Sequence, residues 1–284
     1  MQRIEPSTPF ESNRLSPRLS ARLSLRISKP ILLMCLSLAF LLPAPAQTPL
    51  RVAAAADLEP VLPPILEQFH QSTGIRAEAT YQASAMLTTQ IMNGAPFDLF
   101  LSADLSYPKK LIDAGLADAA GSTDSTTPIT YAKGTLVLWT RKDSALGPPS
   151  LDLLRNPALK RLAIANPDRA PYGRAAVAAL TSLKLYDALS ARLVTAENIA
   201  QGAQFVDSGN ADAGLISLTS ALTPRMASSG AFFVIPRDLY PPIQQGAVIV
   251  TNTTQRAAAH KFLDFLLSPP IQAQLAKSGL TPVN

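Results

Sequence analysis

The 284-residue chain has little of what disulfide-bonded proteins and many enzymes use. It contains one cysteine, Cys35, and two histidines, His70 and His260. Cys35 falls inside an N-terminal apolar run, so the rest of the chain forms neither disulfide bonds nor thiolate metal sites. Both histidines lie on apparent helices among polar neighbours, which is typical of solvated helix positions. The sequence therefore places no histidine base beside a nucleophile.

Motifs that mark common catalytic and phosphate-binding sites are also missing. The sequence has no G-x-S-x-G turn, no G-x-x-x-x-G-K-[ST] loop, no H-E-x-x-H motif and no calcium-binding loop. Asp57, Asp98 and Asp104 fall at predicted strand ends, where an enzyme can place a pair of carboxylates. Helix capping is the simpler interpretation of each, because Asp readily accepts a hydrogen bond from the first turn of a helix. We therefore expect no enzymatic activity.

Basic charge is concentrated at the N-terminus. The formal net charge is +5, but residues 1–46 hold six of the 25 basic and two of the 20 acidic residues, which leaves +1 for the rest. A near-neutral body without a basic stripe has little attraction for a phosphate backbone, so we expect no nucleic-acid partner. The 47% content of hydrophobic residues is enough for sizeable cores.

The basic segment leads into the apolar run 31–42, which is followed by Pro43 and the small residues 44–46. This order is typical of a secretory signal peptide, and it predicts cleavage before Gln47 and a periplasmic protein. The run is short for a bilayer span, which needs roughly 20 residues. An uncleaved anchor and a lipoprotein processed at Cys35 are the alternatives.

Strand and helix patterns alternate along the remainder of the chain, which predicts α/β lobes with parallel strands and crossover helices. The predicted strands are 51–56, 75–81, 98–102, 135–139, 162–165, 211–216 and 247–250. The predicted helices are one that ends near Thr73, then 85–93, 107–114, 174–183, 256–267 and 271–277. Pro60, Pro63 and Pro64 crowd the first helix, so we expect it to start late or to kink.

No Gly/Ser-rich linker separates the two halves, which is explained if the chain crosses between them twice. We expect a signal peptide over 1–46, one lobe from 47–132 together with 250–284, and a second lobe over 133–249.

The segments 52–58, 81–85 and 93–104 read VAAAADL, YQASA and NGAPFDLFLSAD. Together they resemble the periplasmic molybdate-binding proteins of ABC importers, and the similarity extends over nearly all of the chain after 46. The resemblance implies a type II solute-binding fold, with two α/β lobes, two hinge crossovers and parallel-dominated mixed sheets. It also implies a cleft that binds molybdate, and tungstate as well, without a cofactor. An inner-membrane ABC permease would be the partner of this protein, which we expect to be monomeric.

Strand-to-helix junctions supply the groups that such a cleft needs. A loop that leaves a strand and opens a helix presents unpaired backbone N–H groups, which attract anions together with the helix dipole. Four junctions have this form, at 56–58, 84–86, 172–173 and 198–199. Ligands of open α/β sheets bind at the carboxyl ends of strands, where all four junctions should lie. Neutral donors suffice, because many charge-assisted hydrogen bonds replace the hydration shell of the anion.

The resemblance assigns the oxyanion contacts residue by residue. It implies Ser84 as a hydroxyl donor, and Tyr172 and Ile199 as backbone N–H donors from the opposite lobe. Asp57 stands where some members of the family have serine. Since a carboxylate would repel molybdate, we expect Asp57 to donate its main-chain N–H while its side chain turns back as a helix cap.

Further positions are less sharply assigned. Ser217 stands where some members have a ligand-contacting tyrosine, and it supplies either a hydroxyl to the ligand or a bond to local backbone. Ala56 and Ala85 are additional candidates beside Asp57 and Ser84. No side chain is expected to bind a cation directly, because molybdenum would be held as its oxyanion.

Several other functions stay open at this point. Sulfate, thiosulfate and phosphate are alternative ligands, and Asp57 favours phosphate because a protonated anion benefits from an acceptor. An exported hydrolase would need Ser84 or Ser217 paired with a base. The effector-binding half of a transcription regulator would need a helix-turn-helix segment, but the predicted signal peptide occupies that end.

Overall fold

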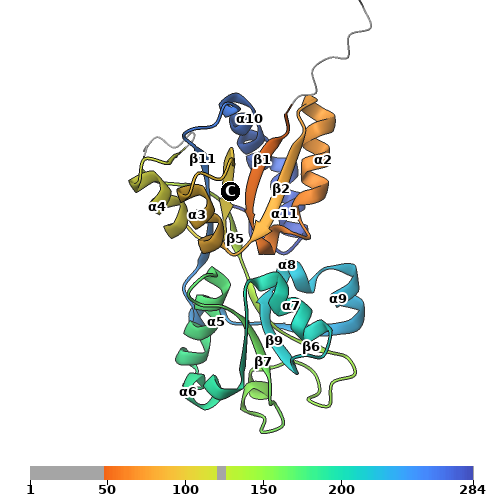
Figure 1. The fold of residues 1–284 in the computed structure, drawn as a ribbon. Coiled ribbons are helices and arrows are strands. Elements are labelled where there is room, and N and C mark those ends of the chain that lie inside the picture. Colours follow the sequence, from red (N-terminus) through yellow and green to blue (C-terminus); the bar gives the residue numbers. More distant parts are fainter. Residues whose placement is uncertain (1–47, 120–125, 284) are drawn as a thin grey trace, which may run out of the picture. The chain divides into compact units, whose positions relative to one another are not determined.

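The computed structural model describes residues 48–119 and 126–283, so the predicted signal peptide lies outside the described residues. Two mixed β-sheets, each flanked by helices, organise this part of the chain (Figure 1). We call the sheet that begins at Leu50 and its helices the first lobe, and the sheet that begins at Leu136 and its helices the second lobe. Both lobes belong to one compact unit that starts at Gln47.

The first sheet has the strand order β2-β1-β3-β11-β4, and β5 also pairs with β11. Its strands are β1 (Leu50–Ala55), β2 (Ala77–Gln82), β3 (Leu99–Ser102), β4 (Ala117–Asp118), β5 (Ile129–Gly134) and β11 (Ile243–Val250). Its helices are η2 (Ala56–Leu58), α2 (Leu62–Thr73), α3 (Ser84–Met92), α4 (Ser106–Asp113), α10 (Arg256–Leu267) and α11 (Pro269–Lys277).

The second sheet has the order β10-β6-β9-β7-β8. Its strands are β6 (Leu136–Arg141), β7 (Leu162–Ala165), β8 (Leu193–Ala196), β9 (Ala213–Ser217) and β10 (Gly230–Val234). Its helices are α5 (Pro171–Ser182), α6 (Tyr186–Leu189), α7 (Ile199–Asp207), α8 (Leu218–Ala221) and α9 (Pro224–Ser229), with the short 3-10 turns η3 (Leu151–Arg155), η4 (Ser190–Arg192) and η5 (Arg237–Leu239).

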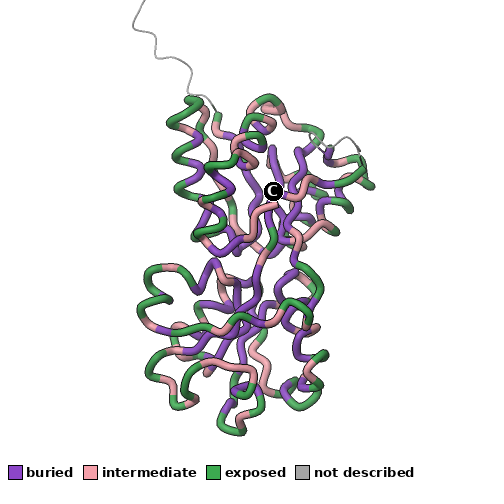
Figure 2. Tube along the Cα trace, turned by 180° about the vertical axis from the view of Figure 1, so that it is seen from behind, coloured by how far each residue is buried: buried purple, intermediate pink, exposed green. Residues whose placement is uncertain are grey.

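Helices cover both faces of the first sheet, which explains why its central strands are almost wholly apolar. Alternate residues of a strand point to opposite faces. In β3, Leu99 and Leu101 therefore join the core that α2, α10 and α11 cover, while Phe100 joins the core under α3 and α4. Buried stretches follow the strands of both sheets in Figure 2.

The chain crosses between the sheets twice, as expected. Only Thr135 separates β5 from β6, and residues 235–242 connect β10 to β11. Strand β11 pairs with β3, β4 and β5, which belong to the first sheet. Residues 243–249 therefore belong with the first sheet, whereas the predicted boundary put them in the second lobe. The other boundaries stay predictions.

Strand pairing is mixed in both sheets. Within the described residues, four pairings are parallel, around β1 and β7, and five are antiparallel. Parallel pairing is thus not the majority that we expected, because β11 alone makes three antiparallel pairings.

Proline decides where two helices begin. The crowded segment after β1 forms the short η2, and α2 starts late, at Leu62, with Pro63 and Pro64 in its first turn. This late start confirms the expectation from the sequence. Helix α5 begins at Pro171 rather than at 174, because proline is favourable in the first turn of a helix.

Candidate functional site

A small cavity of about 10 Å³ lies between the two lobes. Such a volume is about that of one water molecule, so this cavity must widen before it can hold a larger ligand. The cavity lies where β1, β2, β3, β7 and β8 end at their carboxyl ends. Its lining consists of Ala55, Ala56, Asp57, Gln82, Ala83, Ser84, Ala103, Ala170, Pro171, Tyr172, Asn198 and Ile199.

Four helical segments begin at this cavity. Their N-terminal flanking residues are Ala55 for η2, Ala83 for α3, Ala170 for α5 and Asn198 for α7. The three alanines have no side chain with which to cap a helix, and Asn198 Oδ1 accepts only from the amide of Gln201, at 2.9 Å. The first N–H groups of a helix have no acceptor within the helix. Some first-turn amides are already engaged, such as that of Gly173, which donates to the carbonyl oxygen of Ala170. Ser84, Tyr172 and Ile199 are the early helical residues that line the cavity.

Ser84, the first residue of α3, lies in the cavity wall and is buried. Its Oγ accepts a hydrogen bond from the amide of Ala103 at 3.1 Å. A serine hydroxyl has one proton of its own to donate. The contact with Ala103 fixes the oxygen and leaves that proton for a ligand oxygen.

Asp57 also lines the cavity, but its side chain does not cap a helix. It is the second residue of η2 and is fully buried, and its Oδ2 accepts hydrogen bonds from Tyr172 Oη at 3.1 Å and from Gln245 Nε2. The helix-cap prediction for Asp57 is therefore wrong, because the carboxylate reaches α5 in the second lobe and β11 instead. Its Oδ1 has no hydrogen-bond partner, and neither has Oε1 of Gln245.

Burial dominates the electrostatics around Asp57. Loss of hydration raises the pKa of Asp57 from 3.8 to about 6, although hydrogen bonds from Gln245, from Tyr172 and from the backbone amide of Asp57 itself act in the opposite direction. Burial, followed by the negative charge of Asp57, raises the pKa of Tyr131 and of Tyr172 well above the usual value. Both tyrosines are therefore neutral hydrogen-bond donors at physiological pH.

The contacts of Tyr172 explain a glycine at the first crossover. A Cβ atom on Gly134, the last residue of β5, would lie 2.2 Å from Tyr172 Oη. Only glycine leaves the phenol room to reach Asp57. Gln245, the other partner of Asp57, was not singled out from the sequence. Gln244 and Gln245 precede the apolar run of β11 and lie outside the predicted strand 247–250, so the sequence carried no signal for this contact.

The remaining residues predicted to contact the ligand fall into two groups, those that line the cavity and those that do not. Ala56 and Ile199 line the cavity, whereas Ala85 and Ser217 do not. The amide of Ala85 donates across the lobes to the carbonyl oxygen of Arg169 at 3.2 Å. Ser217 precedes α8 and caps it, with Oγ accepting from the amide of Ser220 at 3.3 Å. The structure thus places Ser217 in the local backbone role.

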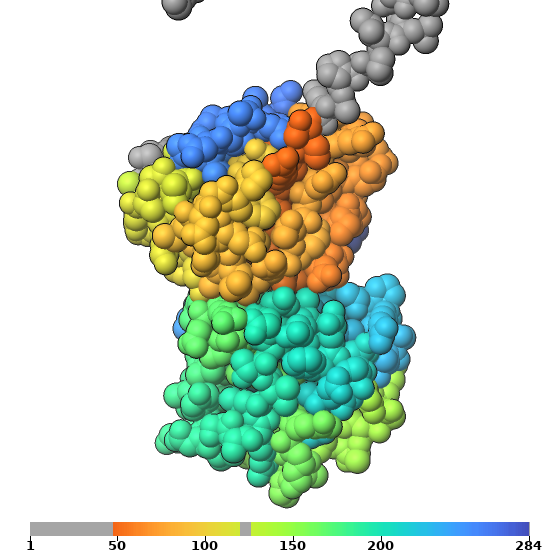
Figure 3. Space-filling model, in the orientation of Figure 1, coloured from red at the N-terminus to blue at the C-terminus, as the bar shows by residue number. Residues whose placement is uncertain are grey.

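Charged side chains join the lobes at the rim of the cavity. Arg174 of α5 forms an ion pair with Asp104 of the first lobe and donates to Tyr107 Oη at 3.2 Å. Tyr107 Oη in turn donates to the carbonyl oxygen of Asp168 at 3.3 Å. On the face shown in Figure 3, the first lobe (orange to yellow) meets the second (green to cyan) directly. This face of the closed conformation is therefore held by polar contacts outside the cavity.

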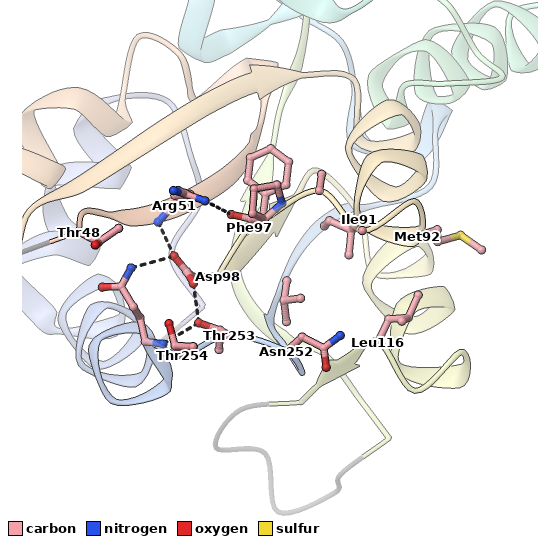
Figure 4. A pocket seen from close by; sticks show the side chains of 15 residues that line it. Thr48, Arg51, Ile91, Met92, Phe97, Asp98, Leu116, Asn252, Thr253 and Thr254 are labelled. Atoms are coloured by element: carbon pink, nitrogen blue, oxygen red, sulfur yellow. Dashed lines mark hydrogen bonds between the residues drawn. The ribbon is translucent and has the colours of Figure 1, made fainter. Parts of the chain in front are cut away.

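A larger cavity, of about 400 Å³, lies in the first lobe alone, at the opposite end of its sheet (Figure 4). Here the Asp98 carboxylate accepts from the Arg51 amide at 2.7 Å, from Thr253 Oγ1 at 2.5 Å and from Gln255 Nε2 at 3.2 Å. Both carboxylate oxygens are satisfied. Asp98 thus caps no helix, contrary to the expectation from the sequence, and instead ties the turn before β3 to β1 and to the segment after β11.

Residues 48–119 and 126–283 contain no group of three or more His, Cys, Asp or Glu side chains placed to hold a metal ion. No helix in these ranges combines the length and the apolar character that crossing a membrane requires.

Comparison with known proteins places this geometry in a family. The model of the bacterial extracellular solute-binding proteins matches residues 50–281. The chain is 38% identical over 219 residues to the molybdate-binding protein ModA of Azotobacter vinelandii, which covers 77% of this chain and 84% of that protein. It is 36% identical over 246 residues to ModA of Rhodobacter capsulatus, which covers 87% and 93%.

Solved structures agree with the sequence comparison. The periplasmic molybdate-binding protein of Azotobacter vinelandii superposes with a TM-score of 0.76 at 33% identity, covering 83% of this chain and 100% of that chain. A substrate-binding domain of a molybdenum ABC transporter from Clostridium difficile superposes with a TM-score of 0.62 at 28% identity, covering 83% and 99%. The chain therefore belongs to the bacterial extracellular solute-binding proteins.

Proposed function

We propose that the protein captures molybdate, and also tungstate, in the cavity between its lobes and delivers it to an ABC importer of the inner membrane. One observation carries the proposal. The N-termini of helical segments from both lobes meet at one cavity beside the ends of β1, β2 and β3, and the cavity lining contains no Lys or Arg. First-turn amides and the Ser84 hydroxyl suit a tetrahedral oxyanion, which can accept hydrogen bonds on every side. The names of the relatives support molybdate as that anion.

The chemistry of the cavity supports binding rather than catalysis. Its lining contains no histidine, and the one carboxyl group, Asp57, is held by Tyr172 and Gln245 rather than paired with a nucleophile. The Ser84 hydroxyl is hydrogen-bonded to a backbone amide instead of to a base. We therefore assign Ser84, Asp57, Tyr172 and Ile199 to ligand binding, the last three through their backbone amides.

Export, oligomeric state and partner complete the proposal. Capture for an importer requires a periplasmic protein, so we propose cleavage of the N-terminal segment before Gln47 and a monomer that docks on its permease. Sequencing the N-terminus of the protein isolated from its native host tests the cleavage site. Recovery of the uncleaved chain from the membrane would contradict it.

A protonated oxyanion such as hydrogen phosphate is the second candidate ligand. The observation in its favour is the unpartnered Oδ1 of Asp57 at the cavity wall, because an acceptor there suits a ligand that carries a proton.

Thermal unfolding in the presence of sodium molybdate, tungstate, sulfate and phosphate tests the proposal. Only the folded, closed protein offers donors from both lobes, so the bound anion stabilises it by about 2.7 kcal/mol at a hundredfold excess over Kd. We expect this stabilisation with molybdate and tungstate. An unchanged melting temperature in millimolar amounts of both would refute the proposal, while a larger shift with phosphate would favour the second candidate.

A further inference from the structure

The position of Asp57 creates a charge problem for the proposed ligand. Its carboxyl group is fully buried in the wall of a cavity that would hold an anion with two negative charges. Two like charges in a poorly hydrated space repel each other much more strongly than in water. The backbone amides cannot neutralise the second charge, because they are neutral dipoles.

The surroundings of Asp57 provide no cation to offset this repulsion. The side chains that approach its carboxyl group are the neutral Tyr172 of α5 and Gln245 of β11, with Tyr131 of β5 nearby. The segment 56–58 packs against β2, α7 and α8. The ionisable groups on these elements and directly beside them are Glu59, Arg76, Glu78, Tyr81 and Asp207, with Tyr240 beside Tyr172 and Lys133 on β5. Arg76 and Lys133 are exposed and do not line the cavity, and the other groups are acidic or phenolic, so the charge of Asp57 is not compensated at the cavity wall.

Three arginines on or beside α5 and α9 are engaged in ion pairs. Arg174 is paired with Asp104 at the rim, and Arg169 is paired with Glu197. Arg225 on α9 is paired with Asp207. None of these three arginines lines the cavity.

The hydrogen-bond pattern leaves room for a proton. Both donors, Tyr172 Oη and Gln245 Nε2, bond to Oδ2 of Asp57, while Oδ1 has no partner although it is buried. A proton on Oδ1 would disturb neither hydrogen bond. It would also turn an acceptor at the cavity wall into a donor, which suits an anion.

We infer that the oxyanion is bound together with one proton, which the carboxyl group of Asp57 holds while the lobes are closed. The inference rests on the proposed function, since it concerns the same cavity. The proton is taken from the solvent when the anion binds and returns to the solvent when the anion leaves, and no other bond forms or breaks. Asp57 is thereby a specificity-determining residue, because its carboxyl group must take up a proton when an anion with two negative charges binds.

The direction of the pH dependence follows from this coupling. Burial already raises the pKa of Asp57 to about 6, and a bound anion raises it further. Well below pH 6 the carboxyl group is protonated before binding, so binding takes up no proton. Above pH 6 each bound anion brings one proton, and Kd rises by up to about tenfold per pH unit.

Calorimetric titration with sodium molybdate tests the inference. Measurements at pH 7.5 in two buffers with different protonation enthalpies count the protons taken up, and measurements at pH 5.5, 6.5, 7.5 and 8.5 give the slope of Kd. The variants are Asp57→Asn, which keeps an acceptor for Tyr172 and Gln245, and Asp168→Asn, which removes an exposed carboxylate near the rim as a matched control.

We expect the wild-type protein and Asp168→Asn to take up close to one proton at pH 7.5 and to bind more weakly as pH rises. Asp57→Asn should take up none, and its Kd should stay constant from pH 6.5 to 8.5. Wild-type binding without proton uptake, or an unchanged slope in Asp57→Asn, would overturn the inference and leave the proposed function standing. Absence of molybdate binding in the wild type at every pH would instead refute the proposed function.

If Asp57→Asn does not fold, the number of protons taken up by the wild-type protein in the two buffers still tests the inference.

Titration with phosphate distinguishes the second candidate ligand from molybdate. Hydrogen phosphate that binds tightly without proton uptake, while molybdate does not bind, would show that the ligand brings its own proton and would overturn the inference for Asp57.

Discussion

The two ends of the first sheet each hold a buried aspartate, and the two differ in how they are satisfied. At the amino end of β3, Asp98 accepts hydrogen bonds on both carboxylate oxygens from Arg51, Thr253 and Gln255. At the carboxyl end of β1, Asp57 accepts both of its hydrogen bonds on one oxygen and leaves the other without a partner.

This difference separates a structural carboxylate from a functional one. A buried polar atom without a partner costs free energy, so a fold retains it where something else makes use of it. Asp98 stands beside the larger cavity and Asp57 beside the smaller one. Between these two cavities, the unpartnered oxygen of Asp57 rather than the volume therefore marks the candidate site. Because His70 Nδ1 and Trp139 Nε1 are also buried without a partner, this criterion serves only together with the helix N-termini at the cavity.

The largest expected effect is a loss of stability when Asp98 is replaced. Asp98→Ala removes the acceptor of three hydrogen bonds and leaves their donors partly buried, so we expect a loss of roughly 3 to 5 kcal/mol in the free energy of unfolding. Urea denaturation followed by the fluorescence of Trp139, the single tryptophan, measures it. The molybdate affinity of the folded variant should stay within about twofold. A stable variant with lost affinity would reverse the roles of the two aspartates.

Whereas Asp98→Ala should lower the free energy of unfolding, Asp57→Asn should raise it, and only at pH values where the carboxyl group of Asp57 is ionised. Because the pKa of Asp57 is about 6 in the folded protein and 3.8 in the reference state, the folded chain binds the extra proton between these values. The contribution of Asp57 to stability therefore falls as pH rises from about 4 to about 6, and it stays low above that range.

Replacing the carboxyl group with an amide removes this cost. We expect Asp57→Asn to exceed the wild type by up to about 3 kcal/mol at pH 8, and to match it near pH 4. Urea denaturation at both pH values checks the difference. A gain of equal size at pH 4 and pH 8 would mean that ionisation of Asp57 is not its cause.

A pair of buried serines sharpens the comparison further. Ser84→Ala deletes a hydroxyl at the cavity, so molybdate binding should weaken by roughly 1.5 to 3 kcal/mol, about ten- to a hundredfold or slightly more in Kd. Ser217→Ala is the matched control, since Ser217 is equally buried but caps α8 away from the cavity. It should cost about 1 kcal/mol of stability and leave Kd unchanged. Equal Kd values for the two variants would remove Ser84 from the site.

The smallest effect is expected at the rim. Arg174→Gln breaks the ion pair with Asp104, which holds the lobes together outside the cavity. Because the arginine is partly exposed, the pair contributes only about 0.5 to 1 kcal/mol, which corresponds to a two- to fivefold faster release of the anion. Stopped-flow displacement of molybdate by tungstate measures the release rate. A hundredfold change would place Arg174 among the ligand contacts.

Local chemistry made part of the site predictable. The family resemblance indicated Ser84, Tyr172 and Ile199, and the unpaired first-turn amides of a helix that follows a strand supported the junctions in which they lie; all three residues line the cavity. The partners of Asp57 could not be predicted in this way. Tyr172 lies 115 residues and Gln245 188 residues along the chain from Asp57, and only tertiary structure brings them together.

The fold shows the same limit. Periodic apolar patterns predicted the central strands and the long helices, because burial on one or both faces produces such patterns. Strands β8 and β10 were missed because they lie at the edges of the second sheet, where part of each strand faces solvent. Strand β4 has only two residues, Ala117 and Asp118, which are too few to form a pattern.

The central position of β11 in the first sheet determines the order in which the two sheets can be completed during synthesis. Every strand of the second sheet lies between residues 136 and 234. A growing chain therefore contains the whole second sheet while the first sheet still lacks β11, the strand between β3 and β4. Until β11 has been made, the first sheet remains in three pieces, which are β2-β1-β3, β4 and β5. Domains fold as units once their residues are present. The second lobe therefore folds first, and Gln245 reaches Asp57 only when synthesis is almost finished.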